Sequence, residues 1–139
     1  MKSFKTTFAA LVLTILLMPL VSCKKESTTV PKTNQEKLLG KWNWISEVTN
    51  DYYGGMSHIT TYNFPVGDYM EFKNDGKVTE YQSGSASTYN YGIISESKIW
   101  LVMAYNIYDV KLITGSDLQL YKKDVNGADY YESTLNFKR

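Results

Sequence analysis

Residues 69–78 read Tyr-Met-Glu-Phe-Lys-Asn-Asp-Gly-Lys-Val, and this decapeptide decides the fold class. Met70 and Phe72 alternate with polar neighbours, which is the period-two pattern of a strand with one buried face. The Asn-Asp-Gly sequence at residues 74–76 follows directly, and Gly76 can adopt the positive φ that a tight hairpin turn requires. The decapeptide therefore predicts an antiparallel hairpin.

The same signals continue on both sides of this hairpin. Turn residues recur about every ten positions toward the C-terminus, for example at residues 114–117 and 124–129. The predicted strands cover residues 41–48, 59–64, 68–73, 77–82, 87–94, 98–103, 108–113, 117–122 and 130–137. This rhythm predicts an all-β fold, an antiparallel up-and-down meander of about eight or nine strands closed as a small barrel.

One helical turn is expected just before the first strand. Asn34 can cap it, Glu36 suits the positive N-terminal end, and Gly40 ends it. We therefore expect a short N-terminal helix followed by strands alone.

Three short motifs, taken in order, resemble the lipocalin-like domains of small bacterial lipoproteins, which share the calycin barrel architecture. They are residues 38–42 (LLGKW), the hairpin described above and the chain end at residues 135–139 (LNFKR). The resemblance implies that Gly40 and Trp42 open the first strand and that the indole plugs the base of the barrel. It also implies that Arg139 or Lys138 packs over this indole as a cation–π contact.

The N-terminus carries a separate pattern. Lys2 and Lys5 precede the apolar run at residues 8–17, as in a secretory signal, and the run is too short to span a membrane. Residues 20–23 (Leu-Val-Ser-Cys) resemble the lipobox of bacterial lipoproteins. That resemblance implies cleavage before Cys23 and acylation of this cysteine.

Lipidation of Cys23 would use the only cysteine in the chain, leaving no disulfide framework, thiolate metal site or cysteine nucleophile. The predicted organisation is a signal peptide at residues 1–22, a lipidated flexible tether at 23–35 and a lipocalin-like barrel at 36–139. Acylated Cys23 would make the lipid bilayer a partner. The expected location is the cell envelope, at the outer membrane.

Composition and motifs argue against several function classes. The 15 basic and 14 acidic residues nearly balance, unlike the charge of a nucleic-acid binder. His58 is the only histidine, so it has no partner for a zinc site and is expected at a strand edge or in a loop. Residues 124–129 lack the spacing of a calcium loop and favour a hairpin. Glu71 and Glu80 are expected on the solvated outer face rather than as a catalytic pair. We therefore expect no enzyme, cofactor or metal.

The unusual feature is aromatic content, with 12 Tyr and 3 Trp. Tyrosine has a flat apolar face and a polar tip, which suit cavity linings and binding surfaces. Residues 50–56, with two glycines beside two tyrosines, are expected to form a mobile lid. The alternative is that tyrosines simply fill cross-strand pairs. The candidate ligand-binding residues are Tyr52, Tyr53, Tyr89, Tyr91, Tyr105 and Tyr108, with Tyr62 as a further member.

Two functions remain open at this point. The first is a binding module that holds a small apolar or amphipathic molecule at the open end of the barrel, in a cavity of roughly a few hundred Å³. The second is a structural or interaction lipoprotein with a filled barrel, acting through its surface as an accessory subunit or glycan contact. No nucleic-acid partner is expected, and no protein partner is identified.

Overall fold

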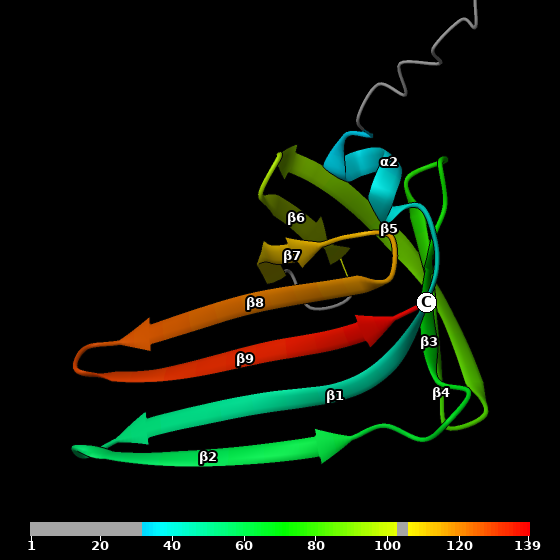
Figure 1. Cartoon of the computed structure of the whole chain (residues 1–139). Helices are drawn as coiled ribbons and strands as arrows, with labels where there is room; N and C mark the ends of the chain where they lie inside the picture. The colour runs from blue at the N-terminus through cyan, green and yellow to red at the C-terminus, as the bar shows by residue number, and fades with distance from the viewer. Residues whose placement is uncertain (1–31, 103–105) are drawn as a thin grey trace, which may run out of the picture. The chain divides into compact units, whose positions relative to one another are not determined.

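The computed structural model describes residues 32–102 and 106–139 (Figure 1). The predicted signal peptide, Cys23 and Tyr105 lie outside these residues. Within the described ranges, no helix is long and apolar enough to cross a bilayer. The elements are α2 (Asn34–Leu38), β1 (Gly40–Tyr53), β2 (Met56–Asn63), β3 (Tyr69–Phe72), β4 (Lys77–Gln82), β5 (Ser85–Ser95), β6 (Lys98–Leu101), β7 (Asn106–Ile113), β8 (Asp117–Asn126) and β9 (Asp129–Lys138).

The strands form a closed antiparallel barrel. Strands β3 to β9 pair consecutively, and β1 joins the two ends by pairing with both β9 and β3. Strand β2 pairs with the second half of β1, beyond the β1–β3 contact, and lies outside the eight-stranded closure. The predicted all-β meander closed as a small barrel is confirmed.

Strands β1, β8 and β9 continue past the end of the closed barrel, and β2 flanks β1 there. The hairpins β1–β2 and β8–β9 lie side by side and form a four-stranded sheet, ordered β2-β1-β9-β8 (Figure 1). Tyr52 faces Tyr130 near its tip, and Asp124 faces Tyr131. We call this part the projecting sheet.

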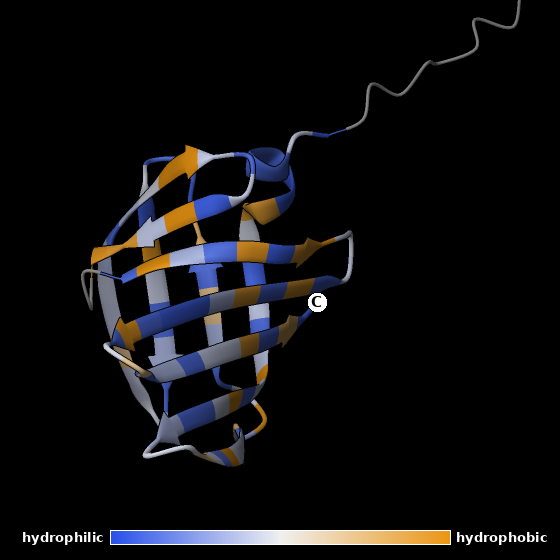
Figure 2. Cartoon of the chain, turned by 90° about the vertical axis from the view of Figure 1, so that its left-hand side faces the viewer, coloured by the Kyte–Doolittle hydropathy of each residue, from blue (hydrophilic) through white to orange (hydrophobic). Residues whose placement is uncertain are grey.

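The barrel interior is filled by the predicted alternation. Met70 and Phe72 are buried, while Tyr69 and Glu71 are only partly covered. Leu118 and Leu120 are buried in the same alternating pattern on β8. Figure 2 shows the resulting exchange of apolar and polar residues along neighbouring strands. The buried apolar residues are Leu38, Trp42, Trp44, Met70, Phe72, Val78, Tyr91, Ile99, Leu101, Tyr108, Leu118, Leu120, Leu135 and Phe137.

Helix α2 covers one end of the barrel. Its N-cap is Thr33 and not Asn34, because the Thr33 hydroxyl accepts from the Glu36 backbone N–H while the Glu36 carboxylate accepts from the Thr33 backbone N–H. Trp42 is fully buried, and its indole N–H donates to the Leu38 carbonyl at 2.7 Å. The predicted contact of Arg139 with Trp42 is present at this end, with the guanidinium carbon 3.9 Å from the ring centroid.

Two further expectations from the sequence are wrong. Residues 50–56 form no loop, since β1 runs to Tyr53, β2 starts at Met56, and Gly54 and Gly55 make a two-residue turn with φ of 59° and 81°. This geometry matches the right-handed twist of paired strands. Glu80 was expected on the solvated outer face, but it is 6% exposed and lies on the same face of β4 as buried Val78.

Candidate functional site

The barrel holds an interior cavity that is partly open to solvent and lies on the far side of Trp42 from α2. Its volume is about 140 Å³. A cavity of similar size in another protein is large enough to hold benzene. It is smaller than the sequence suggested, because aromatic side chains occupy much of this end. The lining residues are Trp44, Glu47, Met70, Tyr89, Leu101, Tyr108 and Leu135.

Trp44 forms a rigid wall of the cavity. Its ring stacks on Phe64 with centroids 4.1 Å apart and on Phe137 at 5.5 Å. Its Nε1 is buried and has no hydrogen-bond partner in the part of the chain that the structure describes. A buried donor without an acceptor is uncommon, so this end of the barrel has unused capacity for a polar contact.

A β-bulge places a carboxylate in the cavity wall. The β1–β9 register shifts between Trp44 and Ser46, where Ile45 is the extra residue and is 43% exposed. The bulge brings Glu47, three positions after Trp44, back to the inner face opposite Leu135. The hydroxyl of Ser133, also on β9, donates to Glu47 Oε1 at 2.6 Å.

Glu80 and Tyr89 form a second polar pair on the inner face. The Tyr89 hydroxyl donates to Glu80 Oε2 at 3.2 Å across the β4–β5 hairpin. Burial raises the pKa of the Glu80 carboxyl, and it also raises the pKa of Tyr89. Burial raises the pKa of Tyr108 to about 12. Both phenols are therefore neutral hydrogen-bonding groups near pH 7.

The predicted tyrosines divide between several locations. Tyr89 and Tyr108 line the cavity. Tyr91 donates to the Lys73 carbonyl and packs edge-on against Phe72, so it supports the core. Tyr62 packs edge-on against Phe64, close to the cavity wall. Tyr52 and Tyr53 belong to the tip of the projecting sheet.

The tip carries a separate, open hollow of about 290 Å³. Tyr52 and Tyr130 stack there with centroids 4.8 Å apart, and Asp129 accepts a hydrogen bond from the Gly54 N–H. His58 lies nearby on exposed β2, opposite Asp51. Tyr52 thus fills a cross-strand pair, as the alternative interpretation of the sequence predicts, whereas Tyr53 is 73% exposed.

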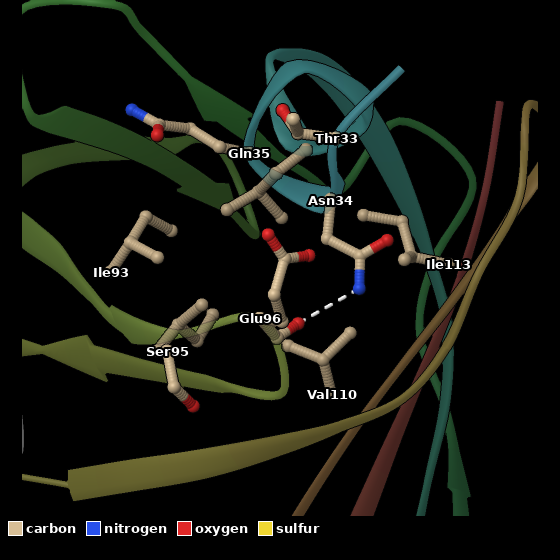
Figure 3. Close-up of a pocket in the computed structure, with 10 residues that line it drawn as sticks. Thr33, Asn34, Gln35, Ile93, Ser95, Glu96, Val110 and Ile113 are labelled. Atoms are coloured by element: carbon tan, nitrogen blue, oxygen red, sulfur yellow. Dashed lines mark hydrogen bonds between the residues drawn. The ribbon is translucent and has the colours of Figure 1, made fainter. Parts of the chain in front are cut away.

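A third hollow lies beneath α2 at the opposite end of the barrel (Figure 3). It measures about 100 Å³ and has an apolar floor that includes Ile99, Val110 and Ile113. Asn34 Nδ2 donates to the Glu96 carbonyl at 2.8 Å across it. This bond attaches the helix to the β5–β6 turn. The polar groups around the hollow therefore hold the fold together, and we do not assign a ligand to it.

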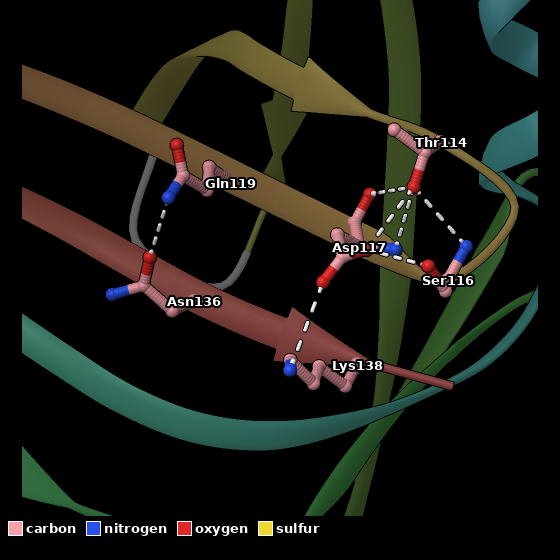
Figure 4. Close-up of polar contacts among 6 residues, drawn as sticks. All are labelled: Thr114, Ser116, Asp117, Gln119, Asn136 and Lys138. Carbon is pink, nitrogen blue, oxygen red and sulfur yellow. Dashed lines mark hydrogen bonds and ion pairs between the residues drawn. The ribbon is translucent and has the colours of Figure 1, made fainter.

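The polar cluster at the β7–β8 turn is also structural (Figure 4). The Thr114 hydroxyl accepts from the backbone N–H groups of Ser116 and Asp117, at 3.2 and 2.9 Å. These bonds close the turn. Gln119 and Asn136 are joined side chain to side chain across the β8–β9 pair.

Sequence reasoning missed Trp44 and Glu47 as site residues. The bulge at Ile45 changes the alternation, and no residue type in this stretch signals it. Within residues 32–102 and 106–139, no three His, Cys, Asp or Glu side chains lie close enough to hold a metal ion.

Neither a protein family, nor a characterised protein, nor a solved structure matches this chain. The barrel and its cavity therefore carry the functional argument.

Proposed function

We propose that this protein is a membrane-anchored lipoprotein whose barrel binds a small apolar or amphipathic molecule. The observation that carries the proposal is the interior cavity of about 140 Å³ between Trp44 and Leu135. Its walls are mainly aromatic and aliphatic, with a few convergent polar groups, as in small-molecule sites generally. Those groups are Glu47 and the phenols of Tyr89 and Tyr108.

The anchoring half of the proposal rests on residues 20–23 and on the polar stretch that follows Cys23. Two or more acyl chains on one residue make membrane attachment stable, since each buried CH₂ contributes about 0.8 kcal/mol. Metabolic labelling of cells with a fatty-acid probe tests this directly. We expect label on the wild-type protein and none on Cys23→Ala. Label that persists in the variant, or a mature N-terminus other than residue 23, would contradict the anchor.

The binding half is tested on the full-length lipoprotein purified from its host. Native mass spectrometry should show a bound small molecule that is lost when the cavity is filled, for example by Leu101→Phe. Leu101 lines the cavity, whereas Leu112 is 40% exposed and serves for a matched control, Leu112→Phe. A bound mass that survives Leu101→Phe would argue against the interior site.

A second candidate function is interaction through the outer surface, and β2 favours it. Every residue of β2 is exposed, and the strand MSHITTYN contains no Lys, Arg, Asp or Glu. Its outer edge has no strand partner among the described residues, and such an edge can pair with another chain. Cross-linking in cells would test this function, with loss of a specific adduct expected for Ile59→Lys.

A further inference from the structure

We infer that the interior cavity selects an organic cation, namely an amine carried on a small, flat apolar body. This inference rests on the proposed ligand-binding function and specifies the chemical class of the ligand. It starts from the charges on the inner face of the barrel.

Three carboxylates gather at this end of the barrel. Asp68 is 3% exposed and Glu80 is 6% exposed. Glu47 lines the cavity itself, opposite Leu135. Asp68 Oδ1 accepts from the Ser83 N–H, while its Oδ2 is buried without a partner among the described residues.

None of these three acids forms an ion pair with a basic group of the described chain. The ion pairs present there involve other carboxylates, and all but one lie on the outer face or at turns. Lys122 faces inward beside Ser133, but its ammonium lies 3.7 Å from Asp124 and over the ring of Tyr131. His58 is exposed at the tip. The cavity end therefore has an excess of negative charge.

An uncompensated carboxylate in a partly dehydrated site favours a cationic ligand. Glu47 accepts a hydrogen bond from Ser133 at 2.6 Å and also lies beside the Tyr131 phenol, whose pKa is raised first by burial and then by this carboxylate, whereas an ionised carboxylate offers about four acceptor positions. An ammonium group with three donors fits this spare capacity. An anionic ligand would meet repulsion from the same groups, which makes charge the main determinant of selectivity.

The remaining walls define the body of the ligand. Met70, Leu101 and Leu135 supply apolar surface, and Tyr89 and Tyr108 supply aromatic rings. Neutral aromatic rings also attract cations through their faces. The volume of about 140 Å³ limits the enclosed part of the ligand to roughly the size of one six-membered aromatic ring.

The test uses three probes of one shape and different charge: benzylamine, benzyl alcohol and benzoate. The methionine methyl groups of the full-length lipoprotein are labelled with ¹³C, and the protein is placed in phospholipid nanodiscs. NMR spectra are then recorded with and without each probe. Met70 lines the cavity, whereas Met56 is 63% exposed on β2, so the two methyl resonances separate cavity binding from other effects. The Met70→Leu variant assigns the cavity resonance.

We expect benzylamine to shift the Met70 resonance with an apparent Kd about tenfold lower than that of benzyl alcohol. Benzoate should bind most weakly. Glu47→Gln, which keeps an acceptor for Ser133, should reduce benzylamine binding to the level of benzyl alcohol. Glu132→Gln removes a carboxylate from the outer face of β9 and should leave benzylamine binding unchanged.

Two other outcomes would contradict the inference, and they are distinguishable from each other. Equal binding of benzylamine and benzyl alcohol, or full benzylamine binding by Glu47→Gln, overturns the cation preference and leaves small-molecule binding intact. Failure of all three probes to move Met70 overturns the interior site and this inference with it. The comparison among probes on the wild-type protein holds even if Glu47→Gln does not fold.

Discussion

Arg139, directly after the end of β9, packs on Trp42, near the start of β1, at the end of the barrel that α2 covers. The guanidinium carbon of Arg139 lies 3.9 Å from the centroid of the Trp42 ring, and Nη2 donates to the carbonyls of Lys37 and Leu39. These carbonyls belong to the end of α2, where a helix leaves its own acceptors unsatisfied. The last residue of the chain thus fastens the helix over the base of the barrel.

Arg139→Ala should lower the free energy of unfolding by about 1–2 kcal/mol, because it removes a cation–π contact and charge-assisted hydrogen bonds. Urea denaturation measures the loss. Lys138→Ala is the matched control, since Lys138 only reaches Asp117 at 4.0 Å and is well exposed, and it should change stability by less than about 0.5 kcal/mol. Equal losses in the two variants would show that Arg139 does not fasten the helix.

Gly55→Ala should destabilise the protein by about 1 kcal/mol, because Gly55 has φ of 81° in the turn between β1 and β2. No atom lies within 4 Å of an added Cβ, so the effect isolates backbone strain. Gly115→Ala is the control, since it also has open space but no positive φ, and it should be neutral or slightly stabilising.

Amide hydrogen exchange at Tyr52 should be slow in the wild-type protein, because this residue lies in a paired strand and not in a mobile lid. Rapid exchange there would restore the mobile-lid interpretation.

The sequence predicted the barrel because its strands are short, antiparallel and joined by turns with clear chemistry. Gly76, for example, has φ of 77°, and Asp75 accepts from the Lys77 N–H, as the Asn-Asp-Gly sequence indicates. The alternation of Met70 and Phe72 then sets which face is buried. Local rules agree with the global fold at these positions.

The candidate site was harder to predict because it departs from the local rules. The bulge at Ile45 brings Trp44 and Glu47 to the same face although they are three residues apart. Glu80 was expected on the outer face together with Glu71, but it lies two positions after buried Val78 on the same face of β4 and is therefore buried as well. Likewise, Gly54 and Gly55 matched both a flexible loop and a two-residue turn, and only strand pairing decides between them.

Glu80→Gln should stabilise the protein at neutral pH by about 1 kcal/mol, because it removes a buried charge and keeps an acceptor for Tyr89. Burial raises the pKa of folded Glu80 above its usual value of 4.5, so the folded state holds this proton more tightly than the unfolded state. Stability from this group is therefore present below pH 4.5 and falls as the pH rises through the raised pKa.

The difference between Glu80→Gln and the wild-type protein should consequently be larger at pH 7 than at pH 4. Urea unfolding at both pH values measures it. The control is Glu71→Gln on the neighbouring strand, whose side chain is 42% exposed, and this substitution should change stability by less than about 0.5 kcal/mol. A difference for Glu80→Gln that grows toward low pH would mean that the ionised carboxylate is stabilised in the folded protein.

Leu101→Phe and Leu118→Phe separate the cavity from the packed core. Leu101 lines the cavity of about 140 Å³, whereas Leu118 is fully buried away from that cavity. At Leu118 the larger ring has no free volume, and overpacking should cost about 1–3 kcal/mol. At Leu101 the ring can enter the cavity, so urea unfolding should give a change within about 1 kcal/mol of zero or a gain in stability. Leu101→Phe should also abolish the shift that benzyl alcohol causes in the Met70 methyl resonance. An equal loss of stability in both variants would mean that this end of the barrel is as tightly packed as its base, and that no ligand fits inside it.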